Sequence, residues 1–132
     1  MDIDQLIFEI AEHKRDSDYE SFFKLLKGRP FFCPVDPATI AGIPKGSSYR
    51  VQANDAIRIP FANINGVKLV PLFTFQGDKR LAKGYFEIEG LEALRMATKA
   101  PGIDGVLFQN KDNSWVGLDL KKIKWILATY GA

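Results

Sequence analysis

The first part of the chain contains two stretches in which apolar residues recur at the spacing of one helix face. The first stretch consists of Ile3, Leu6, Ile7 and Ile10, and the second of Tyr19, Phe22, Phe23 and Leu26. Ser17 and Glu20 fit a capping box that would begin the second helix, and Gly28 would end it. The pattern therefore predicts a helical pair over residues 1–28.

The middle of the chain has the composition and alternation of β-strands. Residues 30–35 form a short apolar run, and residues 49–53 and 57–62 are two further candidates. Residues 36–48, which contain two Pro, two Gly and two Ser, are expected to form a loop. Residues 67–75 are apolar almost throughout, which is typical of a strand buried on both faces at the centre of a sheet.

The dipeptide Asn65-Gly66 stands between two of these runs and predicts a two-residue hairpin, because both central positions of a type I′ turn take positive φ. This turn fixes the register of the two strands, so that Pro60 would face Pro71. Neither proline has an N–H to donate, and a regular ladder should therefore lapse or bulge at that pair.

The rest of the chain alternates short helices with short strands. One helical turn is expected over residues 78–82 and helices over 90–99 and 119–130, with strands over 85–89, 105–109 and 115–118. We expect an α+β fold, in which a mixed or mainly antiparallel sheet of about five strands is packed by the N-terminal helical pair and two further helices. The length of 132 residues fits a single domain, with the helical pair in residues 1–28 and the sheet and other helices in residues 30–130.

The composition supports a sizeable core and gives no sign of a nucleic-acid or membrane partner. Ten Phe, four Tyr and two Trp contribute to a chain that is 46% hydrophobic. The net charge of +2 comes from scattered side chains, whereas nucleic-acid-binding proteins gather basic residues on one face. Lys121, Lys122 and Lys124 come nearest to such a cluster and are expected to be the solvated face of the last helix. No secretory signal and no apolar run of about 18 residues are present, so we expect a cytoplasmic protein.

The titratable residues form no recognisable catalytic or metal-binding motif. The single histidine, His13, lies at the expected end of the first helix, where a cation is favourable. The single cysteine, Cys33, lies in an apolar strand and is expected to be a small buried hydrophobe. No Cys or His pair has the spacing of zinc ligands, and no acidic run has that of a calcium loop. We therefore expect no catalytic residues, no metal, no cofactor and no enzymatic activity.

Three apolar residues lie away from the main stripes of their helices and are candidates for an interaction surface. They are Phe8, Leu25 and Trp125. Exposed aromatic residues on a rigid helix make good anchors for a protein partner or a homodimer. The alternative is that the apolar stripes are wider and these side chains are buried. A charged substitution distinguishes the two, because a core residue would lose stability and an interface residue only association.

A second candidate site lies where the central strand enters a turn. The segment Gln76-Gly77-Asp78-Lys79-Arg80 follows a strand and could open a helical turn, whose N-terminus would favour an anion. An ordinary capped turn is the alternative, because the glycine spacing of a nucleotide fingerprint is missing and Asp78 would repel phosphate. The residues of this possible ligand or anion region are Phe73, Thr74, Phe75, Lys79 and Arg80.

Four short motifs resemble those of a known family. They are Phe32-Cys33-Pro34-Val35-Asp36, Pro71-Leu72-Phe73-Thr74-Phe75, Lys79-Arg80-Leu81 and Gly105-Val106-Leu107-Phe108-Gln109-Asn110. With the helix that contains Leu91 and the closing helix over residues 120–127, they are similar to the SseB-type domain. That family is named after a serine-sensitivity enhancer, and its members are also described as type III secretion enhancers. The resemblance covers residues 18–128.

The resemblance implies the same α+β fold and a non-enzymatic accessory or protein-interaction role, and it brings no catalytic residues. The chain differs from the family pattern at Phe75, where a small hydroxyl residue is usual, and in Gln109-Asn110-Lys111, which lacks the proline of the family's asparagine-proline pair. Both differences lie at strand ends, where a shared ligand site would be affected. The alternative function is that of a small-ligand or anion-binding regulatory domain that uses residues 73–80.

Overall fold

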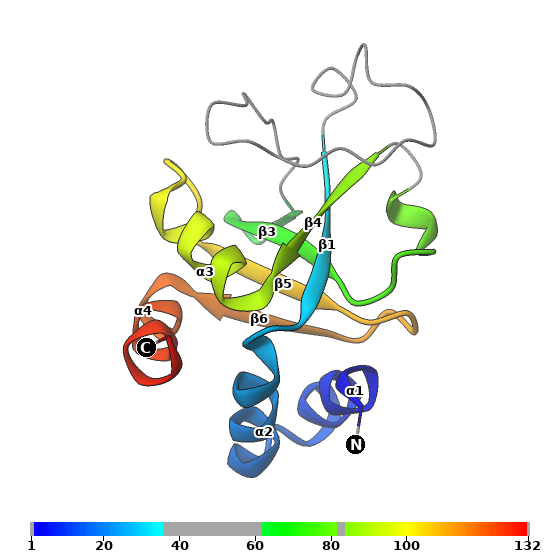
Figure 1. The fold of residues 1–132 in the computed structure, drawn as a ribbon, viewed down its shortest axis with the longest axis vertical. Coiled ribbons are helices and arrows are strands. Elements are labelled where there is room, and N and C mark those ends of the chain that lie inside the picture. The colour runs from blue at the N-terminus through cyan, green and yellow to red at the C-terminus, as the bar shows by residue number, and fades with distance from the viewer. Residues whose placement is uncertain (1, 36–61, 82–83, 132) are drawn as a thin grey trace.

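The computed structural model describes residues 2–35, 62–81 and 84–131 (Figure 1). Some of the sequence-based predictions fall outside the described residues. These are the loop over 36–48, the strand over 49–53, most of the strand over 57–62 and the pairing of Pro60 with Pro71.

Four α-helices and one short 3₁₀ helix occur in this described part of the chain. They are α1 (Ile3–His13), α2 (Asp16–Leu26), η1 (Lys79–Leu81), α3 (Gly90–Lys99) and α4 (Leu120–Tyr130). Each lies where the apolar spacing predicted a helix or a helical turn. In α1 the buried residues are Ile3, Leu6, Ile7 and Ile10, which are those of the predicted stripe.

The described strands form one mixed sheet. They are β1 (Pro30–Pro34), β2 (Ala62–Ile64), β3 (Val67–Phe73), β4 (Tyr85–Glu89), β5 (Gly105–Gln109) and β6 (Trp115–Asp119). The order across the sheet is β4-β1-β3-β5-β6, and β2 pairs with the first part of β3. The β3–β5 pair is parallel, whereas the other pairs are antiparallel. The predicted α+β fold with a mixed sheet and an N-terminal helical pair is therefore confirmed.

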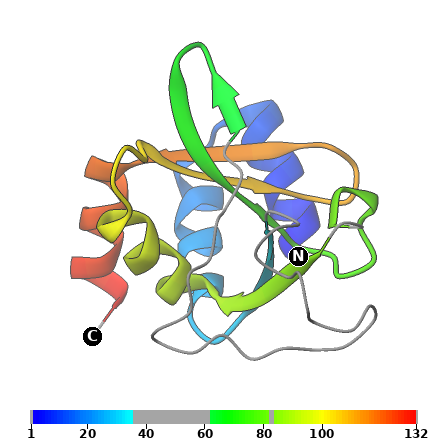
Figure 2. The ribbon, with the colours of Figure 1, turned by 90° about the horizontal axis from the view of Figure 1, so that it is seen from above.

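The hairpin between β2 and β3 has the predicted turn and register. Asn65 and Gly66 have φ of 53° and 84°, as a type I′ turn requires. Ile64 pairs with Val67, and the Asn63 Oδ1 accepts the Gly66 N–H at 3.0 Å. Figure 2 shows β2 and the first part of β3 projecting beyond β5 and β6. The register prediction is confirmed over the described length of β2.

Carboxylate side chains cap the N-termini of α1, α3 and α4. The capping residues are Asp2, Glu89 and Asp119. Glu89 also joins two elements, because one of its oxygens accepts the Glu92 N–H at 2.8 Å and the other accepts the Gly28 N–H at 2.7 Å. The end of α2 is thereby tied to the start of α3.

The predicted capping box at the start of α2 is wrong. The helix begins at Asp16, so that Ser17 lies inside its first turn. The N-cap residue is Arg15, which makes no side-chain capping bond and instead donates from Nε to Asp18 at 2.9 Å. Asp16 and Asp18 place two negative charges in the first turn, where they interact favourably with the helix dipole. These two carboxylates support a helix that begins at Asp16, whereas the predicted capping box placed its start after Ser17.

One face of the sheet forms the main core together with all four α-helices. Phe108 of β5 is fully buried in this core. Its ring makes edge-on contacts with Phe22 of α2, at 5.2 Å between centroids, and with Phe31 of β1, at 4.9 Å. Phe108 therefore contacts both the helical pair and β1 within this core.

The opposite face of the sheet carries a smaller buried cluster. Its members are Phe32 of β1, Phe73 of β3 and Leu81 of η1. Tyr85 of β4 packs edge-on against Phe32, with centroids 5.8 Å apart. The turn after β3 therefore packs on the face that the four helices leave open.

The close approach of β5 and β6 requires a glycine at position 105. A Cβ there would overlap the carbonyl oxygen of Leu118, a backbone atom that cannot move without disturbing the ladder. We expect Gly105→Ala to lower the free energy of unfolding by about 2–3 kcal/mol in urea denaturation followed by circular dichroism. Gly117→Ala is the control, because its Cβ would lie 3.6 Å from the nearest atom, and its effect should stay below about 1 kcal/mol. Similar losses for the two variants would contradict this explanation.

Candidate functional site

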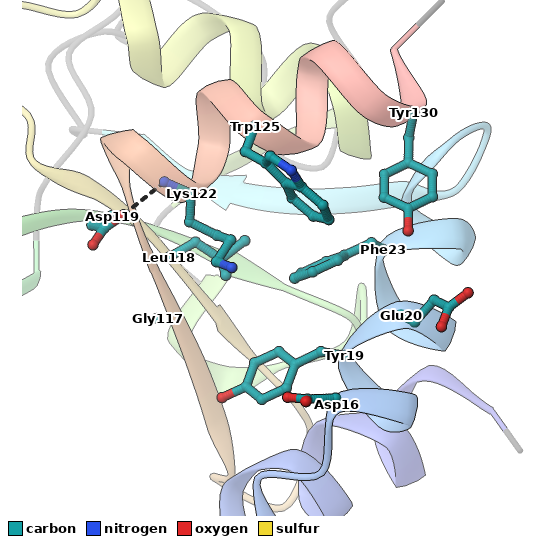
Figure 3. Close-up of a pocket in the computed structure, with 10 residues that line it drawn as sticks. All are labelled: Asp16, Tyr19, Glu20, Phe23, Gly117, Leu118, Asp119, Lys122, Trp125 and Tyr130. Carbon is teal, nitrogen blue, oxygen red and sulfur yellow. Dashed lines mark hydrogen bonds between the residues drawn. The ribbon is translucent and has the colours of Figure 1, made fainter.

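A cavity of about 490 Å³ lies between α2 and α4, beside β6 (Figure 3). We call it the aromatic groove. Its lining comes from three elements: Asp16, Tyr19, Glu20 and Phe23 of α2, Gly117, Leu118 and Asp119 at β6, and Lys122, Trp125 and Tyr130 of α4. Figure 3 shows the side chains of the two helices reaching toward each other across the groove, although the helices lie near opposite ends of the chain. The volume falls within the range of about 300–1,000 Å³ that is usual for binding sites.

Four aromatic rings form a continuous surface in the groove. The Phe23 ring lies among them, with its centroid 6.0 Å from Tyr19, 6.1 Å from Trp125 and 6.3 Å from Tyr130. Trp125 and Tyr130 also contact each other edge-on at 6.1 Å. Phe23 is only 4% exposed, whereas Trp125 is 49% exposed. The groove thus combines a buried aromatic base with an accessible indole, an arrangement common at binding hot spots.

The apolar faces of the two helices hold these rings in place. Tyr19 and Phe23 are four residues apart on α2 and therefore lie on the same side of that helix. On α4, Ile123 and Ile126 are buried in the main core and fix the rotation of the helix. Trp125 then lies beside the buried stripe, on the side that faces α2 (Figure 3).

Charged side chains surround the rings. The Lys122 Nζ lies 5.1 Å from the centre of the Trp125 ring, a cation–π distance. Asp16, Glu20 and Asp119 contribute carboxylates. The lining residues of the groove therefore bear a net negative charge, although the whole chain has a formal charge of +2.

The outer strand of the sheet forms one side of the groove. Among the described strands, β6 pairs with β5 alone. Two hydrogen bonds flank this ladder and set its phase: Asn110 N–H to Ser114 O at 3.0 Å, and Leu120 N–H to Asp104 O at 3.1 Å. Because bonded and non-bonded pairs alternate in an antiparallel ladder, Gly117 directs its N–H and C=O away from β5. Gly117 is exposed, so this edge of the sheet is accessible from the groove.

The three predicted interaction residues lie in three different places. Trp125 is in the aromatic groove. Phe8 is 41% exposed and lines a second cavity, of about 420 Å³, between the start of α1 and the turn that joins β5 to β6. Leu25 is partly buried against the main core. The Trp125 ring contacts the rings of Phe23 and Tyr130.

In the predicted ligand or anion region, Arg80 is held by neighbouring protein groups. Its guanidinium donates to both Asp78 carboxylate oxygens at 2.7 and 2.8 Å, to the Gln109 Oε1 at 2.6 Å and to the Asn110 carbonyl at 3.0 Å. It also lies 4.4 Å from the centre of the Phe73 ring. The hydrogen bond from Arg80 holds the pKa of the Asp78 carboxyl below its usual value. An anion at this position would compete with Asp78 for the same donors.

The other residues of that region have separate surroundings. Phe73 is buried, and the Thr74 hydroxyl donates to Asp4 Oδ1 at 2.6 Å. Phe75 is 49% exposed, and Lys79 is exposed on η1. The aromatic groove and the second cavity are lined by other residues. Ligand binding by residues 73–80 therefore stays a prediction.

His13 and Cys33 both lie where the sequence placed them. His13 is in the last turn of α1, with its Nε2 3.5 Å from the Glu9 carboxylate. Cys33 is fully buried in the main core, and burial raises the pKa of its thiol to about 12. The prediction of a small buried hydrophobe is confirmed. Within residues 2–35, 62–81 and 84–131, no three His, Cys, Asp or Glu side chains gather in a way that could hold a metal ion.

Comparison of the chain with protein-family models, with curated proteins and with solved structures gives no match. The resemblance to the SseB-type domain therefore stays a prediction. None of the described helices has the length and apolarity needed to cross a membrane. A functional proposal has to rest on the geometry of the aromatic groove.

The sequence pattern assigned three of the four groove rings, those of Tyr19, Phe23 and Tyr130, to the apolar stripes of their helices and did not foresee a groove. Phe23 and Tyr130 do lie on such stripes, but apolar spacing within one helix does not say which helices meet. One sequence feature did point to this site: aromatic residues are concentrated on the apolar stripes of α2 and α4, and Trp125 lies beside the second of these stripes. Gly117 gave no signal, since its role depends on the position of β6 at the edge of the sheet.

We expect Arg80→Gln to lower the free energy of unfolding by about 1–2 kcal/mol at neutral pH, because charged hydrogen bonds to three residues are lost. A lowered carboxyl pKa stabilises the fold above the unfolded pKa, and this contribution disappears as the pH falls through the folded pKa. The difference between wild type and Arg80→Gln should therefore shrink in acid, as measured by urea denaturation at several pH values. Lys79→Gln makes the same charge change on an exposed neighbour and should cost less than about 0.5 kcal/mol. A gap between wild type and Arg80→Gln that does not change with pH would contradict the proposed pairing.

We expect the Cys33 thiol to resist modification in the folded protein. Its pKa of about 12 leaves almost no thiolate at about pH 8, and burial blocks access by reagents. Reaction with a disulfide reagent should be slow in buffer, fast in concentrated urea, and limited in rate by unfolding. Stoichiometric labelling of the native protein within seconds would show that the thiol is accessible.

Proposed function

We propose that this chain is a non-enzymatic accessory domain of the SseB type, located in the cytoplasm, that binds a protein partner through the aromatic groove. The observation that carries the proposal is the half-exposed Trp125 ring, packed edge-on against the buried Phe23. A ring that is already held in position loses little conformational entropy when a partner covers it. The groove therefore offers a pre-organised apolar contact of the kind that dominates binding energy at interfaces.

The polar groups of the groove support contact more than catalysis. The Asp119 carboxylate caps α4, with its Oδ1 accepting the Lys122 N–H at 2.8 Å. The Lys122 ammonium lies over Trp125, and Glu20 pairs with Lys24 at 3.1 Å. The lining contains no His, Cys or Ser that could act as a base or nucleophile. These side chains stabilise the groove and give it charge.

Trp125→Gln and Phe8→Gln form a matched pair for testing this function. Both replace an exposed aromatic residue with the same polar one, but only Trp125 lines the aromatic groove. When the purified chain is used as bait in a lysate of its host, wild type and Phe8→Gln should retain the same protein. Trp125→Gln should lose it, and with the purified partner its dissociation constant should rise about tenfold or more, since loss of a central aromatic anchor costs at least about 1.4 kcal/mol.

Stability must be measured alongside binding. Trp125→Gln loses two edge-on ring contacts, to Phe23 and Tyr130, and should unfold about 1–2 kcal/mol more easily while remaining folded. A purified partner that binds Trp125→Gln as tightly as wild type, or one that is lost equally with Phe8→Gln, would contradict a binding site in the aromatic groove.

A further inference from the structure

We propose that the partner's contact segment is an extended, basic peptide that adds as a strand to the edge of β6 within the aromatic groove. This inference rests on the proposed function and specifies the conformation and charge of the bound segment. It follows from three features of the groove: an edge of β6 that pairs with no other described strand, two flanking helices and a surplus of carboxylates among the lining residues.

The edge of β6 presents backbone groups that another chain can pair with. Gly117 directs its N–H and C=O away from β5, and it is exposed. Its missing side chain would point toward Trp115 and Leu107, with a Cβ 3.6 and 4.0 Å from those side chains, on the sheet face opposite the helices. The backbone at Gly117 can therefore be approached from the groove without a side chain in the way. Pairing with such an edge is a recurrent mode of peptide recognition.

The helices beside this edge favour an extended segment over a second copy of the chain. A strand added to β6 would lie about 4.8 Å from it and would direct alternate side chains toward the α2 and α4 rings. Phe23 and Trp125 then offer apolar contact to every second residue of the segment. In a second copy, β6 lies beside its own α2 and α4 (Figure 3). A second copy would also bring the same net negative lining to this edge, and the like charges would oppose the pairing.

The charge of the groove favours a basic segment. The lining residues carry three carboxylates, those of Asp16, Glu20 and Asp119. Among the same lining residues, one side chain, that of Lys122, is a cation. The Glu20–Lys24 pair is solvent-exposed on both sides, at 60% and 61%, and therefore weak enough to exchange partners. Lysine or arginine side chains in the bound segment would meet these carboxylates and could stack on the exposed Trp125 ring. An acidic segment would meet like charge at the same positions.

The test uses two synthetic octapeptides with blocked ends, one of alternating lysine and leucine and one of alternating glutamate and leucine. Binding is measured by titration calorimetry with the full chain as wild type, Gly117→Pro, Gly117→Ala and Trp125→Gln. Proline removes the outward N–H and is tolerated at a strand edge, whereas alanine keeps the N–H and adds a methyl group that points away from the groove. Circular dichroism of each variant checks that it is folded.

We expect the basic octapeptide to bind wild type at least about tenfold more tightly than the acidic octapeptide, and Gly117→Ala is the reference from which the effect of Gly117→Pro is measured. Gly117→Pro should weaken the basic octapeptide by about fivefold to tenfold, the loss expected for one net hydrogen bond. If Gly117→Pro does not fold, strand addition is tested instead by measuring the binding of two modified basic octapeptides to wild type. One is N-methylated on every lysine and the other on every leucine. One of these two should then fail to bind, because it loses the N–H groups that face β6.

The outcomes separate this inference from the proposed function. Equal binding to Gly117→Pro and Gly117→Ala, with a loss in Trp125→Gln, would overturn strand addition and leave the aromatic groove as the binding site. If neither Gly117→Pro nor Trp125→Gln weakens binding of the basic octapeptide, the result would count against strand addition and also against the aromatic groove as the binding site. If the two octapeptides bind equally well, or if the basic one does not bind at about 1 mM, the inference that the bound segment is basic would be overturned. A dimer in light scattering that Gly117→Pro dissociates would show that a second copy occupies the edge.

Discussion

The parallel ladder between β3 and β5 holds the two halves of the sheet together. It pairs Leu69 through Phe73 with Gly105 through Gln109, with β1 and β4 on one side and the β5–β6 hairpin on the other. Pro71 lies in the middle of β3 without breaking this ladder. The Thr74 N–H donates to the Gln109 carbonyl at 3.2 Å, so Thr74 directs its N–H toward β5. Because the N–H groups of successive residues in a strand point to opposite sides, position 71 faces away from β5, and its missing N–H costs the parallel ladder no bond. Among the described residues, that side of β3 pairs with β2 up to Leu69 and with β1 at Phe73, so Pro71 lies between two partners.

The features that the sequence predicts well are those set by neighbouring residues. The bounds of α3 and β5 agree with the structure residue for residue, because apolar spacing, Gly90 and the Pro101-Gly102 pair punctuate that part of the chain. The β2–β3 register follows from two turn residues. The start of α2 was misplaced because several polar residues there can each support a helix N-terminus. The groove was not predictable, since it requires α2, β6 and α4 to meet, and no local pattern encodes that meeting.

The short motifs from which the sequence predicts an SseB-type domain come together in space. Arg80 lies over Phe73 from one motif and donates to Gln109 and Asn110 from another. Together these contacts fix the turn after β3 against the end of β5. In this chain the motif residues serve packing and hydrogen bonding, so a resemblance carried by them concerns architecture. None of the aromatic-groove residues lies in the four short motifs, but Lys122 and Trp125 lie in the closing helix over residues 120–127, through which the sequence also predicts the SseB-type domain.

The buried Asn110 bonds the start of α1 to the turn between β5 and β6. Its amide donates to the Asp4 carbonyl at 2.9 Å, and its Oδ1 accepts the N–H groups of Asp112 and Ser114 at 3.0 and 2.9 Å. The beginning of α1 is thus bonded to a turn 106 residues later in the chain. The start of α1 cannot form this bond until residue 110 has been synthesised, and α4, which completes the aromatic groove, follows residue 110 in the chain. A chain interrupted before α4 would therefore lack Lys122, Trp125 and Tyr130, and with them one whole side of the aromatic groove.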